Sequence, residues 1–188
     1  KPANASFSMF INITPCLDKH LHYHPECELI WIRRGHGSKL VGDSVYPFST
    51  GDMAFLGPNV PHLWRNDLQY TNNPNLVAEV TVIQFSEDFL GKEFFNHEEM
   101  VHIRHLLFHS RCGLDISGAT QKSLQRKIQM LVNADSFNRI LLLLDILNCL
   151  AKSDDLRELS SEGFCQNFSL EDTIRMDKIY KYLIDNFK

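Results

Sequence analysis

Three histidines and one glutamate carry the most distinctive chemistry in this sequence: His22, His24, Glu28 and the more distant His62. Imidazole nitrogens and carboxylate oxygens bind divalent transition metals such as Zn, Fe, Mn or Ni, and this set would leave coordination positions open for a ligand. The alternative is a metal-free pocket in which the same groups hold an organic ligand by hydrogen bonds. Both interpretations require the four side chains to meet in space.

The spacing of the first three residues fits an extended strand. Because side chains alternate along a strand, His22, His24 and Glu28 would share one face. Ile30 and Ile32 continue that face, which therefore has a polar mouth and an apolar floor. The opposite face would carry Leu29, Trp31 and Arg33.

Residues 7–85 have the pattern of a β domain. Short runs rich in β-branched and aromatic residues are separated by Gly, Pro and Asn turns. The expected strands are residues 7–13, 21–33, 38–41, 45–48, 53–56 and 76–85, with a loop at 70–75. Many short strands separated by turns indicate a barrel or a sandwich.

After Ser86 the apolar period lengthens from two to nearly four, which is typical of helices. Helices are expected over residues 87–95, 98–112, 119–132 and 136–151, with Gly113 at a C-cap and a brief strand at 114–116. Residues 153–168 are polar and linker-like. Residues 169–172 resemble a capping box, and they predict a last helix that continues to residue 188.

The helix expected over residues 136–151 is apolar on more than one side. One side would pack against the barrel as ordinary core. A second apolar side is a liability when it is exposed in a monomer, so we expect a homodimer to cover it. The residues expected in this dimer seam are Phe137, Ile140, Leu141, Leu144 and Leu147.

Two motifs resemble those of the cupin β-barrels. The run His-x-His-x-x-x-Glu, followed after six residues by Gly35, is similar to the first cupin motif. Gly51, His62 and Asn66 fall at the spacing of the second. For cupins at large, the resemblance implies a metal at His22, His24, Glu28 and His62.

The sequence departs from the cupin motifs at Cys16, which stands in place of Gly, and at Gly57 and Asn59, which replace Pro and Gly. The residue identities at positions 28–35 and 51–62 match a narrower group of proteins. The sequence resembles the sensor domain of AraC-type transcriptional regulators, over roughly residues 7–188 and most strongly over 22–66. This resemblance implies a barrel that is usually a metal-free ligand pocket. It also implies dimerising helices and a helix-turn-helix DNA-binding domain after them.

Aromatic residues offer stacking surfaces for a planar ligand or a sugar ring. Trp64, two residues beyond His62, is the better candidate for the pocket, and Tyr46 belongs to the same class, although both also suit a core. Trp31 has the wrong parity for the interior and is expected beneath a helix. His97 and His102 are five residues apart, which excludes the zinc-protease motif, whose histidines are four apart.

Composition narrows the class of protein. The net charge of −4 does not indicate the basic surface that nucleic-acid binding requires in this chain. The five cysteines are odd in number and lack Cys-x-x-Cys spacing, which favours a reducing cytoplasm with most of them as small buried residues. The longest apolar run, residues 140–144, is far too short to span a bilayer, so no membrane partner is expected.

The sequence therefore predicts a mainly β fold with α-helices, a cupin-like double-stranded β-barrel (jelly roll) followed by a helical dimerisation segment. Residues 1–86 would form the effector-binding barrel, 87–168 the dimerising helices and linker, and 169–188 the first helix of a truncated helix-turn-helix domain. We expect a cytoplasmic homodimer that binds a small effector, with a sugar among the candidates. It would contact DNA only through the missing domain of a longer chain. The alternative is a metal-dependent cupin enzyme, such as a dioxygenase or sugar isomerase.

Overall fold

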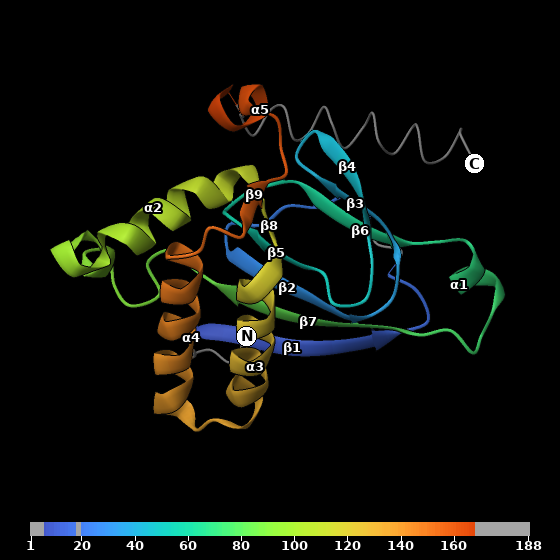
Figure 1. Ribbon diagram of the computed structural model, residues 1–188, viewed down its shortest axis with the longest axis horizontal. Helices are drawn as coiled ribbons and strands as arrows, with labels where there is room; N and C mark the ends of the chain where they lie inside the picture. Colours follow the sequence, from blue (N-terminus) through green and yellow to red (C-terminus); the bar gives the residue numbers. More distant parts are fainter. Residues whose placement is uncertain (1–5, 18–19, 168–188) are drawn as a thin grey trace.

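The computed structural model describes residues 6–17 and 20–167, which form two antiparallel sheets and a layer of helices (Figure 1). The mainly β fold with helices is confirmed. The large sheet has, in spatial order, β1 (Phe7–Thr14), β7 (Ala78–Phe85), β2 (Cys27–Arg34), β5 (Met53–Leu56), β8 (Leu114–Ile116) and β9 (Leu156–Glu158). The small sheet has β4 (Ser44–Phe48), β3 (Gly37–Val41) and β6 (His62–Asn66).

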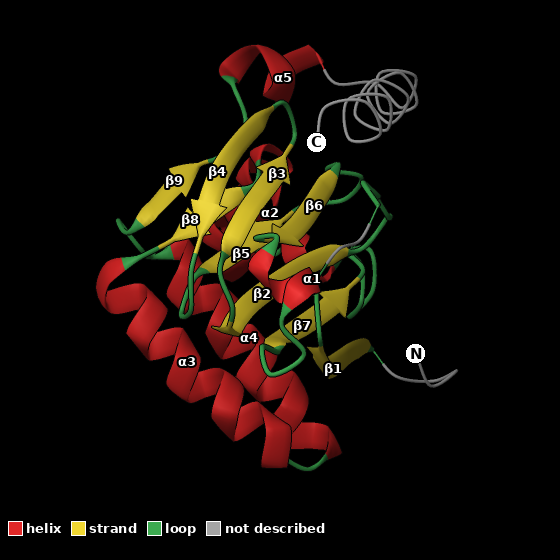
Figure 2. Cartoon of the chain, turned by 90° about the vertical axis from the view of Figure 1, so that its right-hand side faces the viewer, coloured by secondary structure: helices red, strands yellow, loops and turns green. Residues whose placement is uncertain are grey.

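The two faces of β2 separate two cores, as its alternation predicts. Ile30 and Ile32 face the barrel interior, where they pack with residues from the small sheet. Leu29 and Trp31 face the other way and pack with residues from the helices. Figure 2 shows the helical layer to one side of the strands. The expected position of Trp31 beneath the helices is therefore confirmed.

Helices α3 (Gly118–Asn133) and α4 (Ser136–Ala151) form an antiparallel pair against the large sheet. The bounds of both helices agree closely with the sequence prediction. The start of α4 has a strong local signal. The Asp135 side chain accepts a hydrogen bond from the Asn138 amide at 2.9 Å, which caps the helix. The residues that α4 buries in the core are Leu143, Ile146, Leu147 and Leu150.

The segment between β7 and β8 differs from its prediction. Residues 87–95 were expected to form a helix, and this is wrong. The chain turns at Gly91, whose φ of 103° is open to glycine but strained for other residues, and a helix cannot pass through it. Two 3-10 turns, η1 (Phe94–Asn96) and η2 (Glu98–Met100), precede α2 (Val101–His109) and the 3-10 turn η3 (Ser110–Cys112).

Two segments expected to be irregular contain regular structure. A short helix, α1 (Gln69–Asn72), occupies part of the loop expected at residues 70–75. The region expected to be a linker contains β9, which pairs with β8, and α5 (Glu162–Asn167). The capping box and last helix expected at residues 169–188 lie outside the described residues. Within residues 6–17 and 20–167, no helix is long and apolar enough to cross a bilayer.

Candidate functional site

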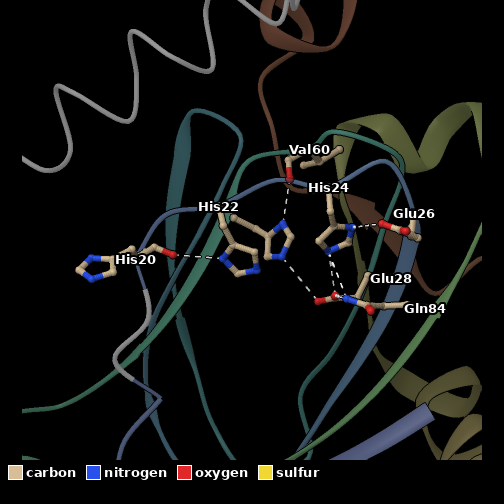
Figure 3. Close-up of polar contacts among 8 residues, drawn as sticks. His20, His22, His24, Glu26, Glu28, Val60 and Gln84 are labelled. Atoms are coloured by element: carbon tan, nitrogen blue, oxygen red, sulfur yellow. Dashed lines mark hydrogen bonds and ion pairs between the residues drawn. The ribbon is translucent and has the colours of Figure 1, made fainter. Parts of the chain in front are cut away.

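His22, His24, Glu28 and His62 meet at one end of the barrel, as the sequence predicts. Figure 3 labels the first three of these residues. Glu28 lies on β2 and His62 begins β6. The two other histidines lie in the segment before β2, and a β-bridge joins His22 to His62 through backbone hydrogen bonds of 3.2 and 2.9 Å. The expected single strand over residues 21–33 is wrong in this part, because Pro25 cannot donate to a strand ladder and β2 begins only at Cys27.

The three imidazole rings are close enough to share one ligand. The ring centroid of His62 is 4.2 Å from that of His22 and 5.2 Å from that of His24. One nitrogen from each ring lies within 4.8 Å of the others. The Glu28 carboxylate completes the group, since its Oε2 is 2.9 Å from His24 Nε2 and its Oε1 is 3.6 Å from His62 Nε2.

Backbone carbonyls orient two of the rings. The Val60 carbonyl lies 2.8 Å from His62 Nδ1, and the His20 carbonyl lies 3.1 Å from His22 Nδ1. A carbonyl oxygen can only accept a hydrogen bond, so both Nδ1 atoms carry a proton, and in a neutral ring Nε2 is then the atom with the lone pair. Metal-binding histidines are commonly held in this way. His62 Nε2 is buried and has no hydrogen-bond partner in the described part of the chain.

Burial and mutual attraction set the charges of the group. Burial lowers the pKa of His62 to about 4, so its ring is neutral at pH 7. For Glu28, burial acts to raise the pKa, but hydrogen bonds from His24 and Gln84 and the attraction of both histidines outweigh it and lower the pKa. Burial likewise acts to lower the pKa of His24, whereas its contacts with Glu28 and Glu26 raise it. The site thus combines an ionised carboxylate with a neutral imidazole.

A small cavity of about 100 Å³ lies beneath these groups, inside the barrel. Its polar lining is His22, Glu28, His62 and Gln84. Its apolar lining is Phe10, Leu17, Ile30, Ile32, Trp64, Val80 and Val82. Since a cavity of about 150 Å³ holds benzene, this one accommodates a few non-hydrogen atoms and is too small for a sugar ring unless it expands.

The structure adds Gln84 to the predicted site and removes Tyr46 from it. Gln84 Nε2 donates to Glu28 Oε2 at 2.6 Å, directly across the β2–β7 pairing. Its signal in the sequence is the alternation of β7, which places a polar residue after Val80 and Val82 on one face. Trp64 lines the cavity, as expected, whereas the Tyr46 hydroxyl donates to the Leu159 carbonyl at 2.9 Å, away from the cavity lining.

The residues expected in a dimer seam fall into three groups. Phe137 and Leu141 are exposed, at 69% and 46% of their surface, so they remain available to a partner. Ile140 and Leu144 are half-buried, with Leu144 packed against the helical core. Leu147 is buried in that core, and its place in the seam was wrong, because the pattern does not show which apolar side of α4 faces the sheet.

Comparisons with known proteins agree with the fold described above. A family model described as "Cupin domain" matches residues 10–69. The chain has a cupin fold. No curated protein sequence matches it.

Solved structures extend the similarity beyond the barrel. ToxT from Vibrio cholerae, bound to (E)-4-(8-methylnaphthalen-1-yl)but-3-enoic acid, is 14% identical with a TM-score of 0.53, over 96% of this chain and 66% of ToxT. The AraC-like transcriptional activator CuxR is 12% identical with a TM-score of 0.51, over 87% of this chain and 53% of CuxR. This chain thus spans just under two thirds of ToxT and about half of CuxR. At these identities the likeness shows the fold alone.

Proposed function

We propose that this chain is the effector-sensing and dimerisation part of an AraC-type transcription regulator. The likeness to ToxT and CuxR supports this role because it includes the helices after the barrel, which a one-domain cupin enzyme does not need. An effector bound in the barrel would control a C-terminal helix-turn-helix DNA-binding domain. In this role the protein is a cytoplasmic homodimer.

The observation that carries the binding site in this proposal is the buried Nε2 atom of His62, which has no hydrogen-bond partner among residues 6–17 and 20–167. A buried polar atom without a partner costs about 1–3 kcal/mol, and a ligand that satisfies it recovers this energy. The lone pair on His62 Nε2 and the Glu28 carboxylate both accept rather than donate. The effector is therefore a small hydrogen-bond donor, such as a polyol or an amine, or it binds through a metal ion.

A divalent transition metal fits the donor set of His22, His24, His62 and Glu28. Nitrogen and oxygen donors suit Zn, Fe, Mn and Ni, and the His20 and Val60 carbonyls fix the rings in the required tautomer. When bound, the ion would act as a Lewis acid for a small ligand. This donor set also favours the second candidate function, a metal-dependent cupin enzyme such as a dioxygenase or sugar isomerase.

A thermal-denaturation screen tests the binding site. The chain is first stripped with EDTA and then mixed with Zn²⁺, Mn²⁺, Fe²⁺ or Ni²⁺, each with and without small polyols, amines and acids. A ligand at 100 times its Kd stabilises the native state by about 2.7 kcal/mol, which is a clear rise in melting temperature. Val82→Phe fills the cavity and is expected to abolish the response to organic ligands. The matched control is Val45→Phe, at a side chain that is 60% exposed.

A second experiment separates the regulator from the enzyme. The full-length protein is tested for binding to DNA upstream of its own gene, with and without the compound found in the screen. Sequence-specific binding that the compound changes supports the regulator. Conversion of the compound by the metal-loaded protein, without specific DNA binding, would support the enzyme and overturn the regulator.

A further inference from the structure

A second hollow of about 980 Å³ lies outside the barrel, between η3, the β5–β6 loop and α5. It shares no lining residue with the barrel cavity. Figure 1 shows α5 beyond the edge of the sheets, and α5 contacts η3. The residues of its lining that carry metal-binding or charged groups include Glu87, His109, Arg111, Cys112, Glu158 and Cys165.

Three donors of this hollow lie together, and His109 lies beside one of them. Cys112 and Cys165 are joined by a disulfide, and a Glu158 oxygen lies within 4.8 Å of both sulfurs. His109 Nδ1 is 3.3 Å from Glu158 Oε1. His109 and Cys112 are three residues apart where α2 continues into η3, so both project from one side of the same turn. Thiolate sulfur, imidazole nitrogen and carboxylate oxygen are each ligand types that zinc takes in proteins.

The backbone holds these donors near one another without the disulfide. Ser160 donates its amide hydrogen to the Cys112 carbonyl at 2.9 Å, and Leu159 donates to the Gly113 carbonyl at 2.8 Å. These bonds tie the segment between Glu158 and Cys165 to the chain beside Cys112. Opening the disulfide therefore leaves two thiols close together beside a carboxylate.

Arg111 is a positive charge in the lining that could repel a bound cation. Its guanidinium already contacts other side chains. Its guanidinium lies 3.5 Å from a Glu87 carboxylate oxygen and over the ring of Phe108, 5.8 Å from its centroid. A site with two thiolates and one carboxylate around a divalent ion carries one negative charge, which a nearby arginine stabilises. The local charge is therefore compatible with a bound cation.

We propose that the reduced chain binds a thiophilic divalent cation such as Zn²⁺ through Cys112, Cys165, Glu158 and His109, and that the disulfide is the oxidised, metal-free state of this site. Opening the S–S bond consumes two electrons and two protons. Two molecules of a small thiol supply them and leave as their own disulfide. Zn²⁺ then displaces the two cysteine protons, because thiolates are the metal ligands.

Cobalt spectroscopy tests this site separately from the barrel histidines. The 188-residue chain is reduced, freed of reductant without oxygen and titrated with Co²⁺. We expect a thiolate-to-cobalt charge-transfer band that saturates at one equivalent, disappears on addition of Zn²⁺ and is absent from the oxidised chain. A chain with His22→Ala and His62→Ala keeps the band, because the barrel group contains no sulfur.

Cysteine variants identify the ligands. Cys112→Ser and Cys165→Ser each lose the band, and the matched control Cys149→Ser, at a half-buried free cysteine, keeps it. The exposed ligands offer variants that fold normally: Glu158→Gln and His109→Ala weaken Zn²⁺ binding at least about tenfold, the loss that even outer-shell changes produce. A reduced, folded wild-type chain without the band, or a Cys165→Ser chain that retains it, overturns the proposal.

Discussion

The two faces of the large sheet use the same strands for different purposes. On the helical face, β2, β5 and β7 contribute Leu29, Phe55 and Ile83, which are at most 2% exposed and pack with buried residues of α3 and α4. On the barrel face, Glu28 and Ile30 of the same β2 border a cavity. A filled apolar interface stabilises the fold, whereas an incompletely filled one with polar groups leaves space for a ligand. The contrast places the proposed binding site on the less densely packed face.

Truncation of one isoleucine on each face gives the largest expected effects. Ile83 is fully buried on the helical face, and Ile30 borders the cavity. Ile83→Ala is expected to reduce the free energy of unfolding by about 4–5 kcal/mol and Ile30→Ala by about 2–3, because contacts are already missing on the cavity side. Urea denaturation measures both. Equal losses would show that the two faces are equally well packed.

Acid is expected to destabilise the barrel face specifically. Burial holds the pKa of His62 at about 4, against 6.5 in the unfolded chain. The unfolded state therefore binds more protons between these values, and up to about 3 kcal/mol of stability is lost as pH falls from 6.5 to 4. The lowered pKa of Glu28 acts in the same direction below its unfolded value of 4.5.

His24 gives an effect of opposite sign. Because its pKa is raised above 6.5, its contribution is fully present below pH 6.5 and is lost as pH rises through the folded value. Unfolding measured against pH in EDTA tests both windows. His62→Gln should flatten the acid limb, and an unchanged acid limb in that variant would assign the loss to other groups.

The Glu28–Gln84 pair tests whether the polar groups of the barrel face act together. Gln84→Leu removes the donor at 2.6 Å from a buried carboxylate and is expected to cost about 1–3 kcal/mol. Changing both residues to Leu should cost less than the sum of the single changes, because neither partner is then left unsatisfied. Additive costs would mean that the two side chains do not interact in solution.

The outer side of α4 should give the smallest effect on folding. Leu141 is 46% exposed, so Leu141→Glu is expected to change the free energy of unfolding by no more than about 0.5 kcal/mol. It should nevertheless shift a dimer towards monomer in sedimentation, since burying a leucine contributes about 1.5–3 kcal/mol. A wild-type chain that is monomeric at tens of micromolar would refute the proposed dimer.

Local patterns predicted much of this fold. The faces of Glu28, Ile30 and Ile32 followed from strict alternation in strands. The start of α4 followed from the cap at Asp135. The meeting of His62 with the other histidines came from motif spacing within a resemblance, because nothing local joins residues so far apart.

The sequence predictions were wrong or incomplete where the structure depends on contacts between residues that are far apart in the sequence. Apolar periodicity did not show that Leu147 faces the chain's own core rather than a partner. Gln84 joins the site because β7 pairs with β2 in one particular register, which no local pattern specifies. The pairing of Cys112 with Cys165 was not foreseen either, because it depends on β9 adding to the sheet edge and bringing α5 back to η3.

The bond between Cys112 and Cys165 also makes part of the chain a covalent ring. The two residues are 53 apart, and the ring encloses β8, α3, α4 and β9. In the chain-entropy model, a loop of this length restricts the unfolded state by about 4 kcal/mol. The α3–α4 hairpin, and with it the surface proposed for dimerisation, lies wholly inside this ring. Reduction without a bound cation would open the ring and allow the hairpin to unfold with a gain in entropy that the closed ring denies it.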